Sequence, residues 1–414
     1  MASILYSAAI RFYGSLLRLA AASGNTKAKA WVIGRRDWKN RLDKALAGRK
    51  GWIWFHCASL GEFEQGRPVL EEYRRRHPEK HVLLTFFSPS GYEVRKDYKG
   101  ADVVCYLPLD TTGNVSAFVG AVNPEKVFFI KYEYWFNLLR ELNKRDIPVY
   151  LVSSIFRKGQ WFFHPLAGSF LRQLRKVRHF FVQDPGSEKL LRAAGISQVT
   201  VSGDTRFYRV MTVSSTGAPI DWPANWKKSR PLLVAGSTWP KDEALLLDLI
   251  KSSDEELLLL LVPHETDPRH LAGIDREIAR LGMTDVTQRL SEIKTEPKAF
   301  TRIIVVDRIG LLSRLYKHAT VAYIGGGFGV GIHNTLEAAV YGVPLLFGPN
   351  YLKFSEAIGL VACGGAVSVQ NKKELSEGLG RWLKNIDARN LAGKAAGEFV
   401  ESRTGATNRI LDAI

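Results

Sequence analysis

Gly325-Gly326-Gly327-Phe328-Gly329-Val330-Gly331-Ile332-His333-Asn334 is the stretch that decides the fold of this 414-residue chain. The apolar run 320–324 precedes it and Leu336-Glu337-Ala338-Ala339 follows it, which predicts a strand, a glycine loop and a helix. Backbone N–H groups of such a loop approach an anion closely, and the helix dipole adds about half a positive charge. Glu337, about one turn into the predicted helix, is placed to accept hydrogen bonds from ribose hydroxyls.

The position of these residues distinguishes two kinds of nucleotide site. A dinucleotide fingerprint places G-x-G-x-x-G after the first strand of its unit and an acid about 20 residues later. Here the loop lies late in the chain, and Glu337 comes too soon. The pattern therefore favours a nucleotide-sugar site, with the alternative that the glycines serve only tight turns.

Apolar runs alternate with helical segments through the rest of the chain. In the first half the predicted strands begin at Trp52, Val82, Val103, Val127, Val149, Phe180 and Val199. Residues 67–76 and 134–144 are predicted helices, and 59–64 a glycine-containing turn. In the second half strands begin at Pro231, Leu257, Ile303, Val321 and Leu345. This alternation predicts parallel sheets with crossover helices.

A segment without apolar periodicity separates the two halves. Residues 214–230 are rich in Ser, Pro and Lys and are predicted to be a linker. We therefore predict an N-terminal basic segment (1–48), a first Rossmann-like domain (49–213), and a second with terminal helices (231–414). Ligands of open parallel sheets bind beyond the carboxyl ends of the strands. The active site is thus expected in a cleft between two doubly wound α/β domains that face each other.

The composition is that of a globular protein, with 46% hydrophobic and 24% charged residues. Cys57, Cys105 and Cys363 form no C-x-x-C pair and have no His at ligand spacing. This predicts a reducing compartment and no structural zinc site. Cys57 lies inside a polar motif, but a small buried thiol is the expected role.

The first 50 residues carry eleven Lys or Arg against two acids, more than half of the formal net charge of +17. The apolar segment 4–22 is interrupted by Arg11 and Arg18, unlike a secretory signal or a membrane-spanning helix. It predicts an interfacial helix whose basic residues reach anionic head groups. The alternative is a surface helix packed on the body of the protein.

Polar motifs follow several predicted strands. They read His56-Cys57-Ala58-Ser59-Leu60-Gly61-Glu62, Lys131-Tyr132-Glu133-Tyr134-Trp135, Gly203-Asp204-Thr205-Arg206-Phe207, Ala235-Gly236-Ser237-Thr238-Trp239, Val262-Pro263-His264-Glu265 and Asp307-Arg308-Ile309-Gly310-Leu311. With the glycine loop and Gly348-Pro349, they resemble the Kdo (3-deoxy-D-manno-octulosonic acid) transferases of lipopolysaccharide assembly, from about residue 50 to about residue 360. The resemblance implies a GT-B glycosyltransferase fold. It also implies a location on the cytoplasmic face of the cell inner membrane, peripheral or N-terminally anchored.

Two residues of the first half acquire roles from this resemblance. Glu62 matches the catalytic carboxylate of the family, the general base for the acceptor hydroxyl in the acceptor-binding domain. An alcohol is a poor nucleophile at neutral pH until a positioned base takes its proton. The sequence around Glu62 also suits a helix-capping role. Arg206 matches a basic residue that stabilises the departing cytidylate, and a guanidinium suits the phosphate and the carboxylate of CMP-Kdo.

The resemblance also implies the positions that contact CMP. They are Ser237, His264, Ile309, Gly310, Leu311, Asn334, Thr335, Leu336 and Glu337. Ser237 is expected to head a helix, as a cap or as a phosphate ligand. His264 and Glu265 replace the usual Arg-His pair, which weakens the prediction of a phosphate contact there. His333 is expected to orient the loop.

Lys131 is the largest departure from the family pattern, which has a glutamate there in a Glu-x-Glu-x-Trp motif. A lysine beside Glu62 would lower the pKa of that carboxyl and weaken the base, or it would bind the carboxylate of Kdo. Alternatively, Glu133 does the work of the missing glutamate. A non-catalytic descendant of the family also stays open.

The predicted reaction is Kdo transfer from CMP-Kdo to a lipid A precursor (lipid IVA-like) at the anionic inner-membrane surface, without a cofactor. No Asp-x-Asp dyad follows a strand, and a CMP-sugar carries only one phosphate, so we predict metal-independent transfer. The alternative is another GT-B glycosyltransferase, or a sugar-nucleotide epimerase, with a different donor. The sequence holds no RRM, KH, zinc-finger or helix-turn-helix pattern, which predicts no nucleic-acid partner.

Overall fold

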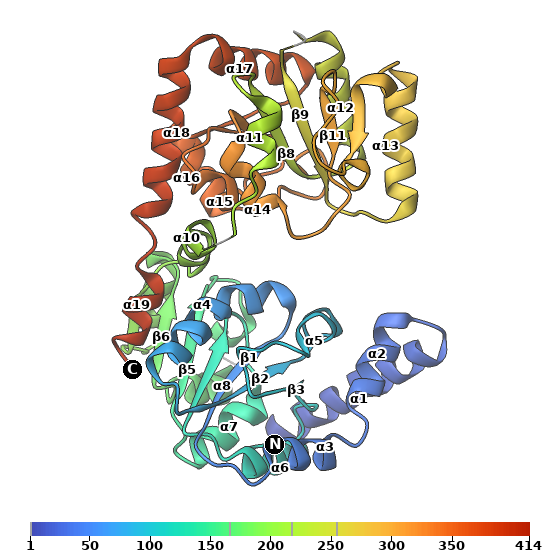
Figure 1. Ribbon diagram of the computed structural model, residues 1–414. Helices are drawn as coiled ribbons and strands as arrows, with labels where there is room; N and C mark the ends of the chain where they lie inside the picture. The colour runs from blue at the N-terminus through green and yellow to red at the C-terminus, as the bar shows by residue number, and fades with distance from the viewer. Residues whose placement is uncertain (1, 165–166, 217, 254–255) are drawn as a thin grey trace. The chain divides into compact units, whose positions relative to one another are not determined.

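The computed structural model describes residues 2–164, 167–216, 218–253 and 256–414, which form two compact α/β units (Figure 1). Unit 1 comprises Met1–Arg209 with Thr404–Ile414, and unit 2 comprises Val210–Arg403. The boundary lies within helix α10 (Arg206–Thr216), ahead of the predicted linker. The linker range itself contains α11 (Trp222–Lys227), because Trp226 is buried and its indole donates to the Thr301 carbonyl at 3.2 Å.

The sheet of unit 1 has seven parallel strands in the order β3-β2-β1-β4-β5-β6-β7. The strands are β1 (Trp52–Cys57), β2 (His81–Phe86), β3 (Val103–Tyr106), β4 (Lys126–Ile130), β5 (Val149–Ser154), β6 (His179–Val182) and β7 (Val199–Val201). Helices cover both faces, so the central strands are continuous apolar runs; all of β1 is buried. The strand order reverses between β1 and β4, which are hydrogen-bonded neighbours. In open parallel sheets, ligands bind at the carboxyl edge beside such a reversal.

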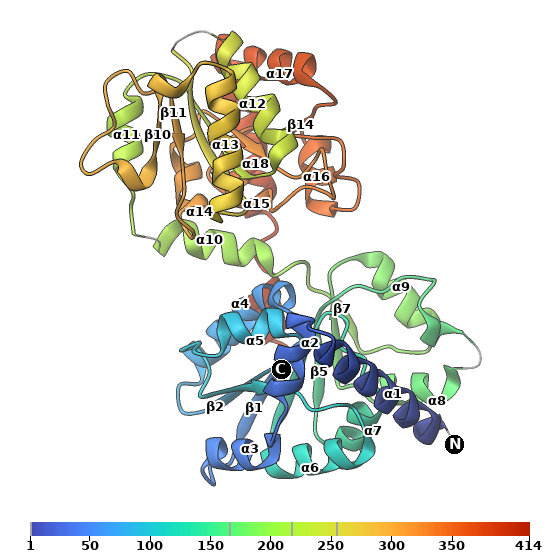
Figure 2. The same ribbon diagram turned by 90° about the vertical axis from the view of Figure 1, so that its right-hand side faces the viewer.

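The helices of unit 1 begin with three that precede the sheet. In full they are α1 (Ala2–Ala22), α2 (Thr26–Gly34), α3 (Trp38–Leu46), α4 (Leu60–Arg76), α5 (Pro89–Arg95), α6 (Thr112–Val122), α7 (Phe136–Lys144), α8 (Gly168–Leu174), α9 (Pro185–Ala193) and α19 (Ala406–Leu411), with the 3-10 turn η1 (Trp161–Phe163). Helices α1 and α2 pack side by side (Figure 2). One face of α1 packs on the unit: the Tyr6 ring lies 5.6 Å from the Phe136 ring, and Asn137 Nδ2 donates to Ser7 Oγ at 3.0 Å.

The opposite face of α1 is apolar and exposed. It carries Ile4, Leu5, Phe12, Leu16 and Leu19, which we name the α1 stripe. The helix is thus packed on the protein, as the alternative prediction had it, and still presents an apolar surface. Among the described helices, none combines the length and the apolarity needed to cross a bilayer.

The end of the chain differs from the prediction that residues 231–414 form one domain. Helix α19 packs against α4 of unit 1. Ile410 and Leu411 enter an apolar cluster with strands of that sheet, and Arg76 binds Asp412 at 2.6 Å and Asn408 at 2.9 Å. Burial of the apolar face of this short helix is what attaches it to unit 1.

Unit 2 repeats the architecture with seven parallel strands in the order β10-β11-β9-β8-β12-β13-β14. They are β8 (Leu232–Thr238), β9 (Leu258–Pro263), β10 (Thr287–Arg289), β11 (Ile303–Val305), β12 (Val321–Ile324), β13 (Leu345–Phe347) and β14 (Ala366–Ser368). The helices are α12 (Pro240–Ser252), α13 (Pro268–Arg280), α14 (Leu312–Leu315), α15 (Leu336–Ala339), α16 (Ser355–Ala362), α17 (Lys372–Lys384) and α18 (Ile386–Glu401), with the 3-10 turns η3 (Thr284–Val286), η4 (Leu290–Glu292) and η5 (Tyr316–His318). Here the order reverses between β8 and β12. The glycine loop leaves β12 at this reversal.

Candidate functional site

Glu62 lies just beyond β1, in the first turn of α4. The predicted turn at 59–64 is wrong: Ser59 has an extended backbone and caps the helix, which begins at Leu60. The Ser59 hydroxyl accepts the Glu62 N–H at 3.5 Å, and Glu62 Oε2 accepts the Ala58 N–H at 2.6 Å. The Glu62 carboxylate therefore bonds a backbone N–H just before the start of α4, as the predicted capping role requires.

The environment of Glu62 favours its protonated form. Burial, followed by the negative charge of Glu133, raises the pKa of Glu62 to about 8, although the Ala58 N–H and Lys131 act in the opposite direction. The space around the preceding Gly61 is open, because an added Cβ would meet no heavy atom within 4 Å. A carboxyl group whose pKa is near neutral is suited to proton transfer, and the role of Glu62 as general base stays a prediction.

Glu133 is held in a buried network with His56. The His56 Nε2 lies 2.8 Å from Glu133 Oε2, and the Trp135 indole donates to the same oxygen. The other His56 nitrogen, Nδ1, lies 2.8 Å from Thr85 Oγ1. His56 and Glu133 are almost completely buried. Glu133 is therefore engaged by two partners, and it acts on Glu62 through its charge.

Lys131 follows β4 in a strained conformation. Its φ of 67° is in the left-handed region, and its N–H donates to the Val152 carbonyl at 2.9 Å. Its ammonium lies 5.5 Å from the centre of the Tyr132 ring and lowers the pKa of Glu62, in the direction predicted from the sequence. The chain thus places opposite charges, Lys131 and Glu133, near one carboxyl group.

Arg206 is paired within unit 1. Its Nε donates to Asp204 Oδ2 at 2.8 Å, and its N–H donates to Asp204 Oδ1 at 2.9 Å. The neighbouring Thr205 is buried, and its hydroxyl bonds Ser153 Oγ at 2.9 Å and the Gln65 carbonyl at 2.5 Å. The motif that contains Arg206 is therefore anchored to the strand β5 and to α4. To contact a phosphate, the Arg206 guanidinium must either bind it together with Asp204 or leave Asp204.

Ser237 lies at the strand-order reversal of unit 2, but it does not head a helix as predicted. It is part of β8, where the β8–β9 register shifts, and its φ is 54°. Helix α12 begins three residues later at Pro240, with Asp242 Oδ2 accepting the Trp239 N–H at 3.0 Å. The Ser237 hydroxyl has no hydrogen-bond partner among the described residues. A strained backbone that presents a free hydroxyl is consistent with a ligand contact.

Several N–H groups of the glycine loop bond to the loop itself and to its neighbours, and anion binding by the loop stays a prediction. Gly326 N–H donates to the buried Asp242 carboxylate at 2.8 Å, Gly325 N–H to the Gly236 carbonyl at 2.9 Å, and His333 N–H to the Gly325 carbonyl at 3.2 Å. Helix α15 has four residues, too few for a substantial dipole.

The glycines of this loop are needed for close packing. A Cβ on Gly325 would lie 2.3 Å from the Ser237 carbonyl oxygen, and one on Gly327 would lie 2.5 Å from the Gly348 nitrogen. The loop is thus fixed against the end of β8 and against the Gly348-Pro349 turn. These close contacts fit the alternative prediction, that the glycines are there for tight turns.

Trp239, His264 and His333 form a stack at the same edge. The two imidazole rings lie 4.2 Å apart, and the Trp239 and His264 rings 4.9 Å apart. Trp239 Nε1 lies 2.9 Å from His333 Nε2. An indole N–H only donates, so Nε2 accepts and the proton of neutral His333 is on Nδ1. Burial, and then His264, lower the pKa of His333 to about 4, which keeps it neutral.

The Trp239→Phe substitution will remove the hydrogen bond that fixes the tautomer of His333. Phenylalanine keeps the stacked ring but has no N–H, so both neutral tautomers of His333 become accessible. Long-range ¹H–¹⁵N spectra of histidine-labelled protein will report a protonated Nδ1 in the wild type and a mixture in the variant. Trp226→Phe, which removes another indole hydrogen bond of unit 2, will leave the His333 signals unchanged. Identical His333 spectra in wild type and Trp239→Phe would contradict the assignment.

The other predicted CMP positions are distributed along two segments. Asn334 Nδ2 donates to Glu337 Oε1 at 3.0 Å, and Asn334 Oδ1 accepts the Leu336 N–H at 3.2 Å. Thr335 and Leu336 are fully buried, so their side chains support the segment from within. Ile309 and Gly310 lie on an exposed loop, and Leu311 precedes α14 at its end. Glu337 is half-exposed, and Ile309 is 88% exposed.

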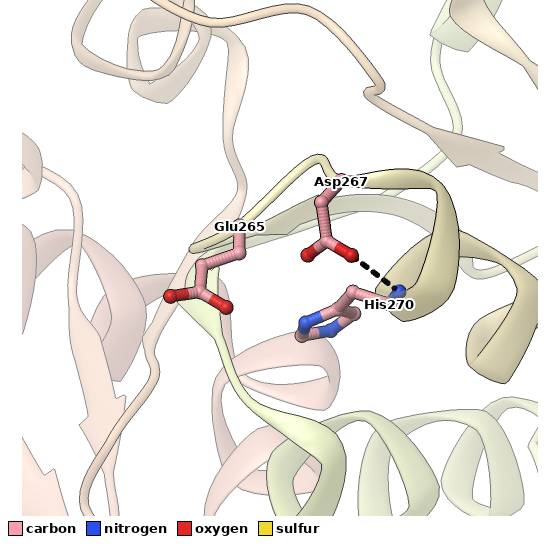
Figure 3. A group of neighbouring side chains, drawn as sticks. All are labelled: Glu265, Asp267 and His270. Atoms are coloured by element: carbon pink, nitrogen blue, oxygen red, sulfur yellow. Dashed lines mark hydrogen bonds between the residues drawn. The ribbon is translucent and has the colours of Figure 1, made fainter. Parts of the chain in front are cut away.

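A group of possible metal ligands lies beyond β9, in a sequence without an Asp-x-Asp motif. One ligand atom each of Glu265, Asp267 and His270 lies within 4.8 Å of the others (Figure 3). Two of the three side chains have other contacts. Asp267 caps α13 by accepting the Arg269 and His270 N–H groups, and His270 Nε2 lies 2.8 Å from Glu243 Oε1. Metal-independent transfer stays a prediction.

Solved structures of sugar-nucleotide enzymes share this fold. A putative UDP-N-acetylglucosamine 2-epimerase from Listeria monocytogenes aligns with a TM-score of 0.60 and 15% identity, covering 88% of this chain and 96% of that one. The UDP-GlcNAc 2-epimerase from Neisseria meningitidis aligns with a TM-score of 0.60 and 14% identity, covering 88% and 99%. Two parallel seven-stranded sheets of this kind define a GT-B-type fold, which many glycosyltransferases have.

The sequence comparisons find similar proteins of one kind. Residues 36–209 match the family described as 3-Deoxy-D-manno-octulosonic-acid transferase (kdotransferase). The 3-deoxy-D-manno-octulosonic acid transferase of Haemophilus influenzae is 25% identical over 373 residues, covering 87% of this chain and 86% of the relative. That of Aquifex aeolicus is 27% identical over 340 residues, covering 80% and 86%. The chain is similar to the Kdo transferases over most of its length, and the named relatives are glycosyltransferases, so the resemblance found in its motifs is confirmed.

Proposed function

We propose that this chain transfers Kdo from CMP-Kdo to a phosphorylated lipid A precursor, with Glu62 as the general base. Glu62 takes the proton of the acceptor hydroxyl, whose oxygen bonds to the anomeric carbon of Kdo while the bond from that carbon to the CMP phosphate breaks. The observation that carries the proposal is the position of Glu62: beside an open approach, at the β1–β4 reversal, with its pKa raised to about 8.

Residues of unit 2 are proposed to hold the donor. The free hydroxyl of Ser237, the Nδ1–H of His333 and the carboxylate of Glu337 supply donors and an acceptor at the β8–β12 reversal. These groups suit a phosphate and the hydroxyls of a ribose. Arg206 is proposed to stabilise the departing phosphate, and Lys131 to attract the carboxylate of Kdo. No step in this proposal uses a metal.

The proposed acceptor is a lipid, and the proposed location is the cytoplasmic face of the inner membrane. The α1 stripe supports this location, because an exposed apolar helix face flanked by cations binds at the interface of an anionic bilayer. The net excess of positive charge in the first 50 residues adds to the attraction.

The test is transfer in detergent from freshly generated CMP-Kdo to a tetraacylated lipid A precursor, with EDTA present, followed by mass spectrometry. A mass gain in steps of one Kdo supports the proposal, and the steps count the sugars added. Absence of product from folded protein, with and without added Mg²⁺, would refute the Kdo assignment. Product that forms only with Mg²⁺ would refute metal independence alone.

A further inference from the structure

A basic pocket of about 360 Å³ lies in unit 1, where the three N-terminal helices meet the loop before α6. Its lining comes from α1, α2, the turn after α2, α3, the 108–109 loop and α6. The residues are Arg18, Trp31, Val32, Arg35, Arg36, Trp38, Pro108, Leu109 and Asn114. Three arginines and no carboxylate line it. We name it the N-terminal pocket.

Arg35 makes the charge of this pocket unusual. Its guanidinium donates to the Phe87 carbonyl at 2.7 Å and to the Leu107 carbonyl at 2.9 Å, and it lies 4.0 Å from the centre of the Trp31 ring. Burial lowers the pKa of Arg35 to about 9, and the groups that oppose this are Tyr106, Tyr13 and Cys105, with no carboxylate among them. Arg35 is half-buried and forms no ion pair with a described residue, and an anion in the pocket would stabilise its charge.

Further donors in the lining are unused. No described residue forms a hydrogen bond or an ion pair with the side chain of Arg18 or Arg36. The indole N–H of Trp31 is buried and bonds to none of the residues that the structure describes; Trp31 itself is 6% exposed. Buried donors are nearly always satisfied, so an orphaned one at a cavity indicates an absent acceptor. The nearest acid in sequence, Asp37, already accepts from Asn40.

The place of the pocket indicates the kind of anion. Arg18 belongs to α1, the helix that carries the apolar stripe of Leu16 and Leu19. We propose that the N-terminal pocket binds the phosphate monoester headgroup of a membrane lipid, while the α1 stripe contacts the acyl chains. Guanidinium groups match the geometry of phosphate oxygens, and a monoester offers three of them with more charge than a diester. This inference deepens the proposed membrane contact and does not depend on the transfer reaction.

The test compares binding of the full chain to phosphatidylcholine vesicles that contain phosphatidic acid, a monoester, or phosphatidylglycerol, a diester. The wild type is expected to prefer phosphatidic acid by about tenfold. Arg18→Gln/Arg36→Gln is expected to abolish this preference. Arg11→Gln/Lys27→Gln removes the same charge from exposed positions of α1 and α2 outside the pocket, and is expected to keep it. Equal loss of the preference in both variants, or no preference in the wild type, would overturn the proposal.

A second experiment, with a water-soluble lipid, distinguishes binding in the N-terminal pocket from contact of the α1 stripe with a membrane. Calorimetry with dihexanoyl phosphatidic acid below its micelle concentration is expected to show binding that Arg18→Gln/Arg36→Gln removes. Inorganic phosphate is expected to bind at least tenfold more weakly, and equal affinity would overturn the assignment to a lipid. Failure to bind any vesicle, with soluble phosphatidic acid still bound, would refute the α1 contact and with it the membrane part of the proposal.

Discussion

Replacing Glu62 by glutamine will lower kcat for Kdo transfer by a factor of about 10² to 10⁴, the usual contribution of a positioned general base. Glutamine keeps the size of the side chain and an oxygen that accepts the Ala58 N–H, but it cannot take a proton from the acceptor. The melting temperature will stay the same or rise, because the substitution removes a buried carboxyl near Glu133. Steady-state kinetics with both substrates and a thermal melt measure the two effects.

Glu64→Gln is the matched control for this substitution. Glu64 lies on the same helix, half-exposed, and binds Arg95 at 2.7 Å. Its replacement will change kcat by less than about threefold, since an exposed ion pair contributes at most about 1 kcal/mol. Folded Glu62→Gln enzyme with kcat close to that of the wild type would show that another group is the base.

The second large effect is on stability: Glu133→Ala will lower the free energy of unfolding by about 3–5 kcal/mol, because one buried and one half-buried donor each lose an acceptor. These are His56 Nε2 and the Trp135 indole, and the cavity left by the side chain adds to the loss. Denaturant unfolding followed by tryptophan fluorescence will measure the difference. Glu64→Ala, on the partly exposed side of α4, will cost no more than about 1 kcal/mol.

The same network gives Glu133 a kinetic signature. In the milder Glu133→Gln variant, loss of the negative charge will lower the pKa of Glu62, so activity will persist to lower pH. A variant that lost stability without this shift would show that Glu133 has only a structural role. Unchanged stability of Glu133→Ala would contradict the buried pairing itself.

Much of the fold was predictable from local pattern. Buried parallel strands are apolar runs, and turns and helices separate them, so the central strands of both sheets followed from the sequence. The short edge strands β10 and β14 were missed, because Val367 is the only large apolar residue that they contain. The attachment of α19 to unit 1 was also missed, since residues close to the C-terminus pack on a helix more than 300 positions earlier in the chain.

The site was predicted less completely, for reasons that individual residues make clear. The positions of Glu62 and Ser237 at strand ends followed from the motifs, but their backbone geometry did not. Ser237 adopts a left-handed conformation inside a strand, which no residue pattern indicated. The pairing of His56 with Glu133 joins β1 to the segment that follows β4, and it depends on strand order. Asp242, which accepts the N–H groups of Trp239 and Gly326, was not identified from the sequence. A pattern in the sequence could have indicated it, because an acid two residues after a proline is typical of a helix start.

The pH dependence of kcat/KM tests the central claim, that Glu62 is the base, most directly. Glu62 acts when deprotonated, so kcat/KM of the wild type will rise about tenfold per pH unit and level off near pH 8. Lys131 lowers the pKa of Glu62, so Lys131→Met will move the limb to higher pH, whereas Glu133→Gln will move it to lower pH. A flat wild-type profile between about pH 6 and 9, or a limb that neither substitution moves, would contradict the account.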